Sequence, residues 1–289
     1  MISVLFAVLT ALSNGAASVL QRRAALNVPA GEAMRLSLIG HLLRQRVWLC
    51  GIGLVIVAAV CQAVALATGP IAVVQPIFVI ELPATLLLAG VVMRARVPRT
   101  VWYGVAAVTA GLALGMAAAA PVGGRDSVPG ADWIPALVVT GLFEAALIVA
   151  ALGTGGNARA ALLGLAAACG YALTAALMKD AMAKLDEGGV TALLSAWQLY
   201  ATAAAGVGAL FLLQNALHSG TLVAVQPMLT LGDALISVTY GVTLFGEHLR
   251  TGWWLLPQLA GVALIAVGCV VLARSPLATG SPAPAPRVR

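Results

Sequence analysis

Long apolar stretches that are almost free of charge constrain the fold of this chain more than any other feature. Between residues 47 and 93 the only charged side chain is Glu81, and between residues 190 and 245 it is Asp233. About 20 apolar residues in a helix cross the hydrocarbon core of a bilayer. Only 9% of the 289 residues are charged, against about 25% in soluble domains. The sequence therefore predicts a polytopic membrane protein and excludes a soluble enzyme, a nucleic-acid-binding module and a disordered chain.

Charged clusters and turn-forming residues divide the sequence into nine predicted transmembrane helices. The first has its basic residues after the apolar stretch, whereas a secretory signal has them before it, so we interpret it as a retained span. Connections are predicted at residues 153–157, 179–189 and 214–220. The predicted spans are residues 1–20, 47–67, 71–93, 100–119, 133–152, 159–178, 190–213, 220–245 and 252–273.

Two segments are predicted to lie outside the membrane core. Residues 36–43 are apolar but too short to cross a bilayer, and arginines flank them. We therefore expect an interfacial helix with His41 on its wet side, and leave open whether this helix enters the membrane. Residues 275–289 contain four prolines among small residues and are predicted to be a disordered tail.

The distribution of lysine and arginine predicts how the chain is oriented, because cytoplasmic loops carry an excess of these residues. With the N-terminus outside, twelve of the sixteen lie on the cytoplasmic side, and the four outside are Arg125, Lys179, Lys184 and Arg250. We therefore expect a multi-pass protein of the plasma membrane with its N-terminus outside and its C-terminus in the cytoplasm. The net charge of +6 is then a topology signal and predicts no nucleic-acid partner.

The two halves of the sequence repeat weakly. Val74-Gln75-Pro76 recurs 151 residues later as Val225-Gln226-Pro227. Each half contains four predicted spans, within residues 1–120 and 157–273, and a single span within residues 131–152 links them. Because four spans begin and end on the same side, one linking span places the second unit upside down in the membrane. The expected fold is all-α, with nine transmembrane helices forming two inverted four-helix repeats joined by a linking helix.

Three acidic residues, Glu81, Glu144 and Asp233, are predicted near the centres of their spans. A carboxylate at the bilayer centre is costly, and no lysine or arginine is predicted within a span to pair with it. A proton, a mobile cation or water must then stabilise each acid, and all three are features of a transport pathway. Glu81 and Asp233 occupy nearly equivalent positions in the two halves. For Glu144, on the linking span, a structural hydrogen bond or a contact with a second copy in a homodimer is an equal alternative.

Proline residues mark a second feature at the same depth. Pro76 and Pro227 have no backbone N–H, so each frees a carbonyl group one turn back. Gln75 and Gln226, beside them, can bind that carbonyl or a solute, which predicts a pair of helix breaks at a binding site; a packing kink is the alternative. Asn14 is a further candidate for solute binding or coupling, although it too is more often an interhelical contact. Polar residues that are more often interhelical contacts or interface anchors are Gln62, Tyr171, Trp197, Gln198 and Tyr240.

Short motifs resemble a known superfamily of membrane transporters. The eighth span ends in Leu244-Phe245-Gly246-Glu247-His248-Leu249, which resembles a G-E-x-L pattern. With two inverted units that each contain a proline hairpin, the chain resembles the drug/metabolite transporter (DMT) superfamily. Nine spans and an arginine-rich first loop are most similar to its NIPA-type magnesium transporter and EamA-like branch. The resemblance covers residues 1–273 and implies Mg²⁺ as the solute, although Arg96 stands where the first unit would match Glu247.

Transport is the function that these features predict. The expected protein is a secondary carrier whose halves rock around Glu81, Asp233 and the two Q-P steps, and its solute is a small cation. A proton-coupled exporter of metabolites or drugs is one alternative, and a non-transporting membrane scaffold is the alternative from another class. The sequence has no H-E-x-x-H, G-x-S-x-G or Walker motif, so we predict no enzyme and no cofactor. The expected partners are the solute and the lipid bilayer, and no set of metal ligands is predicted.

Overall fold

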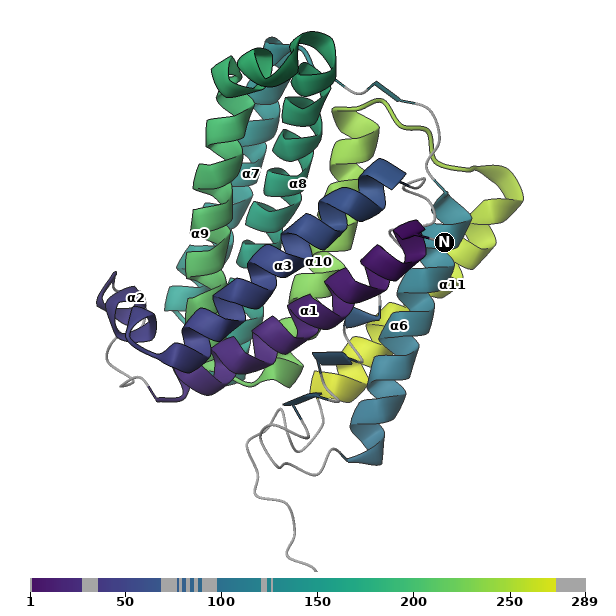
Figure 1. Cartoon of the computed structure of the whole chain (residues 1–289). Coiled ribbons are helices and arrows are strands. Elements are labelled where there is room, and N and C mark those ends of the chain that lie inside the picture. The colour runs from purple at the N-terminus through teal and green to yellow at the C-terminus, as the bar shows by residue number, and fades with distance from the viewer. Residues whose placement is uncertain are drawn as a thin grey trace, which may run out of the picture.

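The computed structural model of the chain is a bundle of long helices (Figure 1). It describes residues 2–27, 36–68, 77, 80–81, 84–85, 88–89, 98–120, 124–125 and 127–273. Within these residues the elements are helical and include no β-strand. The elements are α1 (Ile2–Ala25), α2 (Leu36–Leu43), α3 (Arg46–Thr68), α6 (Arg99–Ala119), α7 (Gly130–Leu152), α8 (Gly156–Ser195), α9 (Trp197–Ser219), α10 (Leu222–Thr243), the short 3₁₀-helix η2 (Gly252–Trp254) and α11 (Leu255–Ala273).

Seven helices in the described ranges are long and apolar enough to cross a membrane. They coincide with seven of the nine predicted spans, so the protein is a multi-pass helical membrane protein. The second predicted span begins as α3, whose first part, Arg46–Gln62, is a shorter apolar helix. The third, with Gln75 and Pro76, lies largely outside the described residues. The seven spans are Val4–Ala25, Arg99–Ala119, Gly130–Leu152, Gly156–Leu185, Trp197–Ser219, Leu222–Thr243 and Gly252–Leu272.

The short helix predicted at residues 36–43 is α2, with the same bounds. Its Leu42 is fully buried against Ala24 of α1 and Trp48 of α3, whereas His41 is exposed. This packing fixes α2 beside the end of α1 and the start of α3, at the margin of the bundle (Figure 1).

Two predicted connections begin too early, because polar side chains there find partners between helices. The charged segment 179–189, predicted to be a loop, continues α8, whose backbone departs from helical geometry only at Gly188 and Gly189. Gly189 has a φ of 69°, a value that favours glycine. The segment 214–220, predicted to be a break, is helical to Ser219. Its first residue, Gln214, is buried inside the bundle, where its side chain donates to the Gln21 side chain of α1 at 2.9 Å.

Helix α8 lies at the centre of the second half of the chain. It packs against α7, α9 and α10, while α1 packs on α3, and α6 packs on α11. In Figure 1, α7, α8 and α9 stand on one side, α6 and α11 stand on the other, and α1 and α3 cross in front of α10. The alanines at 166–168 of α8 are fully buried, and such small side chains allow membrane helices to pack closely.

Glycine residues bring the backbones of α6 and α11 into direct contact. A Cβ atom at Gly111 would lie 2.6 Å from the carbonyl oxygen of Gly261, and one at Gly261 would lie 2.6 Å from the carbonyl oxygen of Gly111. A second close approach joins Gly268 to Gly104, where a Cβ atom on Gly268 would lie 2.7 Å from the Gly104 oxygen. Only glycine permits these distances, so the crossing of α6 and α11 is fixed by these four positions.

Candidate functional site

Two of the acidic residues predicted to share a site lie close together. Gln226 of α10 donates from Nε2 to Oε1 of Glu81 at 2.9 Å. The side chain of Asn14 of α1 also hydrogen-bonds to Glu81, and the charge of Asp233 acts on the same carboxyl group. Tyr171 of α8 interacts electrostatically with both acids. These five residues, which we name the acidic site, come from α1, α8, α10 and the segment that carries Glu81.

Helix geometry explains why Gln226 and Asp233 serve the same site. They are seven residues apart on α10, which is about two helical turns and returns to the same face. Gln226 is fully buried, whereas Glu81 and Asp233 are each partly exposed. The amide therefore holds Glu81 from within the bundle, and both acids remain accessible to water or a solute.

Gly15 allows the segment that carries Glu81 to lie against α1. A Cβ atom at Gly15 would lie 3.0 Å from Oγ1 of Thr85 and 3.1 Å from its backbone nitrogen. Thr85 is fully buried, and its hydroxyl donates to the carbonyl oxygen of Glu81 at 2.8 Å. A larger side chain at position 15 would push this segment away from α1 and separate Asn14 from Glu81.

Among the described residues, no basic side chain forms an ion pair with the acidic site. The ion pairs found among the described residues join other groups: Arg125 to Asp132, Lys179 to Glu247 and Lys184 to Glu187. Two neighbouring carboxylates repel each other, and burial removes part of their hydration. If Glu81 and Asp233 are both charged, a cation must therefore balance them. If Glu81 is neutral, it must have bound a proton.

Acceptor atoms dominate the chemistry of the acidic site. Oε1 of Gln226 is buried and has no hydrogen-bond partner, because the amide presents its Nε2 atom to Glu81. Carboxylate and amide oxygens suit hard cations and ammonium groups. Within the described residues, no group of three or more His, Cys, Asp and Glu could hold a metal ion. A metal ion at this site would therefore depend on amide oxygens in addition to the two acids.

Glu144 belongs to a different group of residues. It is half-exposed on α7, and its charge acts on Cys169 of α8 and Tyr240 of α10. The hydroxyl of Tyr240 lies 2.5 Å from the hydroxyl of Thr140, one turn before Glu144. The structure thus brings Glu81, Asp233, Gln226 and Asn14 together, and it places Glu144 apart from them.

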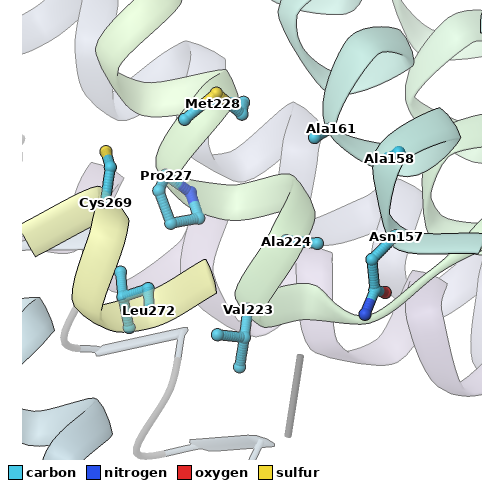
Figure 2. Close-up of a pocket in the computed structure, with 9 residues that line it drawn as sticks. All are labelled: Asn157, Ala158, Ala161, Val223, Ala224, Pro227, Met228, Cys269 and Leu272. Atoms are coloured by element: carbon cyan, nitrogen blue, oxygen red, sulfur yellow. The ribbon is translucent and has the colours of Figure 1, made fainter. Parts of the chain in front are cut away.

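Pro227 lies inside α10, which continues through it from Leu222 to Thr243. Beside it is a cavity of about 230 Å³ between α8, α10 and α11 (Figure 2). The cavity is mostly apolar. Among its described lining residues, Asn157 has the one side-chain amide, and its Oδ1 accepts from the Thr221 backbone at 3.0 Å. Its lining residues are Asn157, Ala158, Ala161, Val223, Ala224, Pro227, Met228, Cys269 and Leu272.

The sequence did not reveal a buried acid at the far end of α8. Asp180 is fully buried and accepts hydrogen bonds from the Val128 backbone at 3.0 Å, Trp133 Nε1 at 2.8 Å and Gln198 Nε2 at 3.0 Å. Its neighbour Lys179 lies in the same span. The only sequence signal was the presence of polar Trp133 and Gln198 near the ends of neighbouring spans.

Lys179 and Glu247 form an ion pair that the sequence also did not reveal. Their Nζ and Oε1 atoms are 2.8 Å apart, and Nζ lies 4.1 Å from the centre of the Phe245 ring. Gly241 makes room for this carboxylate, because a Cβ atom there would lie 2.5 Å from Glu247 Oε2. The G-E-x-L pattern therefore supplies the acidic partner of a lysine in α8.

Comparison with known proteins reveals one relationship that extends over nearly the whole chain. No model of a known protein family matches the sequence. A protein of Corynebacterium glutamicum, described as uncharacterized, is 26% identical over 277 residues, which cover 95% of this chain and 96% of the relative. No solved structure matches. The relative's description names no activity, so the function must be argued from the acidic site itself.

Proposed function

We propose that the protein is a secondary membrane transporter that moves a small cationic solute by alternating access. The observation that carries this proposal is the acidic site, where Glu81 and Asp233 lie together without a basic partner among the described residues. The unpaired Oε1 of Gln226 adds a buried acceptor to the same site. A passing cation satisfies all three groups, and its departure leaves the two acids ready for a proton or another cation.

The proposed architecture is nine transmembrane helices in two inverted four-helix units joined by a linking helix. Contacts between equivalent helices of the two units support this architecture. Ala110-Gly111 recurs as Ala260-Gly261 in the sequence, and these two glycines contact each other, as positions near a two-fold axis do. Gly15 of α1 contacts Thr85 in the third predicted span, and in the second unit a Cβ atom on Gly232 would lie 2.8 Å from Ala168 of α8. Inverted units of this kind bind solutes near the middle of the membrane.

The proposed solute is Mg²⁺, as the resemblance to the NIPA-type and EamA-like branch of the DMT superfamily implies. Mg²⁺ takes oxygen ligands and retains several of its water molecules. Glu81 and Asp233 offer carboxylates, Gln226 offers its unpaired oxygen, and the partial exposure of both acids leaves space for retained water. An excess of arginine at the ends of α1 and α3 supports the orientation with the N-terminus outside and the C-terminus in the cytoplasm.

Exchange of a proton for a metabolite or drug cation is the second candidate function. Tyr171 favours it, because a phenol beside both acids can donate a hydrogen bond to whichever carboxylate is charged. The same two acids serve both candidates, so the difference lies in whether uptake depends on a proton gradient.

Flux into vesicles tests the proposal. We expect purified protein in proteoliposomes to move Mg²⁺ or a small organic amine, and Glu81→Gln and Asp233→Asn to reduce flux more than about tenfold, equivalent to about 1.4 kcal/mol. The solute should also raise the melting temperature of the wild type only. An imposed pH gradient separates the candidates, since it accelerates flux only in a proton exchanger.

Glu187→Gln is the matched control, because Glu187 is exposed and pairs with Lys184 away from the acidic site. It should retain the flux of the wild type. Equal flux in Glu81→Gln, Asp233→Asn and the wild type would show that the acidic site does not carry the solute. Absence of flux for every cation and metabolite tested, in protein that stays folded, would favour the scaffold function.

A further inference from the structure

Basic residues at the two ends of the bundle have different partners. At the end formed by the connector before α7 and the middle of α8, each of three cations is paired with a carboxylate at 2.6–2.8 Å: Arg125, Lys179 and Lys184. At the opposite end, Arg23, Arg44 and Arg46 are exposed, and none has an ion pair within the described ranges. Among the described residues, no carboxylate therefore balances these three guanidinium groups.

The three arginines lie on the surface where α1, α2 and α3 meet. Arg23 is in the last turn of α1, Arg44 directly follows α2, and Arg46 begins α3. The three elements are joined beneath this surface, because Leu42 of α2 is buried against Ala24 of α1 and Trp48 of α3. A hydrogen bond of 3.4 Å between Asn27 and Gln45 links the same segments.

Apolar side chains lie among these arginines. Leu26, Leu43 and Leu49 are 57%, 51% and 47% exposed. We name the six residues the arginine patch: Arg23, Leu26, Leu43, Arg44, Arg46 and Leu49. A surface that alternates guanidinium groups and exposed leucines fits an amphipathic anion better than a free ion, because it offers contacts to both the charge and the apolar chain.

A buried donor without a hydrogen-bond partner lies in the first turn of α3, between Arg46 and Leu49 in the sequence. The indole Nε1 of Trp48 has no hydrogen-bond partner, although the side chain is only 4% exposed. A buried N–H without an acceptor costs free energy.

We propose that the arginine patch binds the phosphate head group of an anionic phospholipid in the leaflet at this end of the bundle. The guanidinium groups of Arg23, Arg44 and Arg46 hold the phosphate, and the exposed leucines contact its acyl chains. Each arginine near an anionic surface strengthens binding about fivefold. The bound lipid therefore stabilises the junction of α1, α2 and α3. This inference is independent of the solute and of transport.

Lipid-dependent unfolding of the full-length protein tests the proposal. Purified protein is transferred to vesicles of phosphatidylcholine alone or of phosphatidylcholine mixed with phosphatidylglycerol, and the melting temperature is measured in each. We expect phosphatidylglycerol to raise the melting temperature of the wild type, and native mass spectrometry to show that it is retained more than about fivefold over phosphatidylcholine. The triple variant R23Q/R44Q/R46Q should lose both effects, whereas R250Q, at the opposite end, should retain them.

Two further measurements keep the test decisive. Single variants R44Q and R46Q should each lower retention of phosphatidylglycerol severalfold, even if the triple variant does not fold. Inorganic phosphate should leave the melting temperature unchanged, because it offers nothing to the leucines. Equal stabilisation by both lipids, full retention in the arginine variants, or stabilisation by inorganic phosphate equal to that by phosphatidylglycerol would overturn the proposal.

Discussion

Asp180 and Glu81 represent two different ways in which this protein holds a carboxylate among apolar helices. Asp180 accepts three hydrogen bonds from neutral N–H groups and is fully buried, so its charge is stabilised by fixed donors. Glu81 accepts from two side-chain amides, remains partly exposed and has Asp233 beside it. The first carboxylate is therefore satisfied by the fold, whereas the second still requires a proton or a cation from outside.

Replacement of Asp180 by alanine should destabilise the protein strongly. The substitution leaves three donors, on Val128, Trp133 and Gln198, without an acceptor. Buried unsatisfied donors cost about 1–3 kcal/mol each, so we expect a loss of at least about 3 kcal/mol, measured as a lower melting temperature in detergent. Glu187→Ala, which removes an exposed acid seven residues further along α8, should change stability by less than about 0.5 kcal/mol. Equal effects of the two substitutions would show that Asp180 is not a structural anchor.

The sequence predicted four of the five members of the acidic site, all but Tyr171, because isolated charges in apolar stretches are visible without a structure. Glu81 and Asp233 are each the only charged residue in a long stretch, and Gln226 follows from the repeated Q-P step. Asp180 escaped prediction because its donors are 52, 47 and 18 residues away along the chain. A local pattern cannot distinguish a charge that ends a helix from one that neighbouring helices satisfy.

At the level of elements, the sequence predicted where helices lie better than where they end. Seven spans coincide with helices because each has enough apolar residues to cross the bilayer. A loop was predicted at residues 179–189 because charged residues usually lie outside the membrane core. Instead, α8 continues to the glycine pair at 188–189. The pairing of α6 with α11 depends on glycines 150 residues apart, and only the weak repeat indicated their equivalence.

The contact of α6 with α11 should depend on Gly111 and not on Gly115. A Cβ atom at Gly111 would lie 2.6 Å from the backbone oxygen of Gly261, whereas nothing lies within 4 Å of a Cβ atom at Gly115. Gly111→Ala must therefore separate the helices, and overpacking of this kind costs about 1–3 kcal/mol. Gly115→Ala should be neutral or stabilise the protein by up to about 1 kcal/mol, because alanine favours the helix.

Thermal unfolding of both variants in detergent measures this difference. A lower melting temperature for Gly111→Ala, together with an unchanged or higher one for Gly115→Ala, is the expected result. If both variants unfold at the temperature of the wild type, α6 and α11 do not touch at Gly111 and Gly261 in the protein.

At the scale of the whole molecule, polar contacts hold the helices together at both ends of the bundle. At one end, Gln21 of α1 bonds to Gln214 of α9, and the guanidinium of Arg22 donates to the carbonyl of Leu217. These contacts join the two proposed units. At the other end, the backbone N–H of Arg250 donates to the carbonyl of Ala119 in α6 at 3.0 Å and joins the units, while Lys179 of α8 pairs with Glu247 in the same loop as Arg250. Proposed alternating access requires one end to open as the other closes.

The contact between α1 and α9 leaves two buried polar atoms without hydrogen-bond partners. Nε2 of Gln21 and Oε1 of Gln214 are buried without partners, although the two amides share one hydrogen bond. Unpaired groups of this kind cost about 1–3 kcal/mol each, and water that entered an opened end would satisfy them. The packing at this end is therefore weakened by unpaired polar atoms, which suits a contact that would break in the proposed transport cycle.

Hydrogen exchange of the full-length protein in detergent tests whether the two ends are coupled. Glu247→Gln removes a half-buried ion pair worth about 1 kcal/mol, so backbone amides at 244–250 should exchange about fivefold faster. If the ends alternate, amides at 21–25 and 214–218 should exchange more slowly in the same variant, because the population shifts toward the arrangement closed there. Gln214→Ala should produce the reverse pattern, since it opens the contact of α1 with α9. Faster exchange at both ends in either variant would mean that each substitution only loosens its own surroundings, and the two halves would then not rock as coupled units.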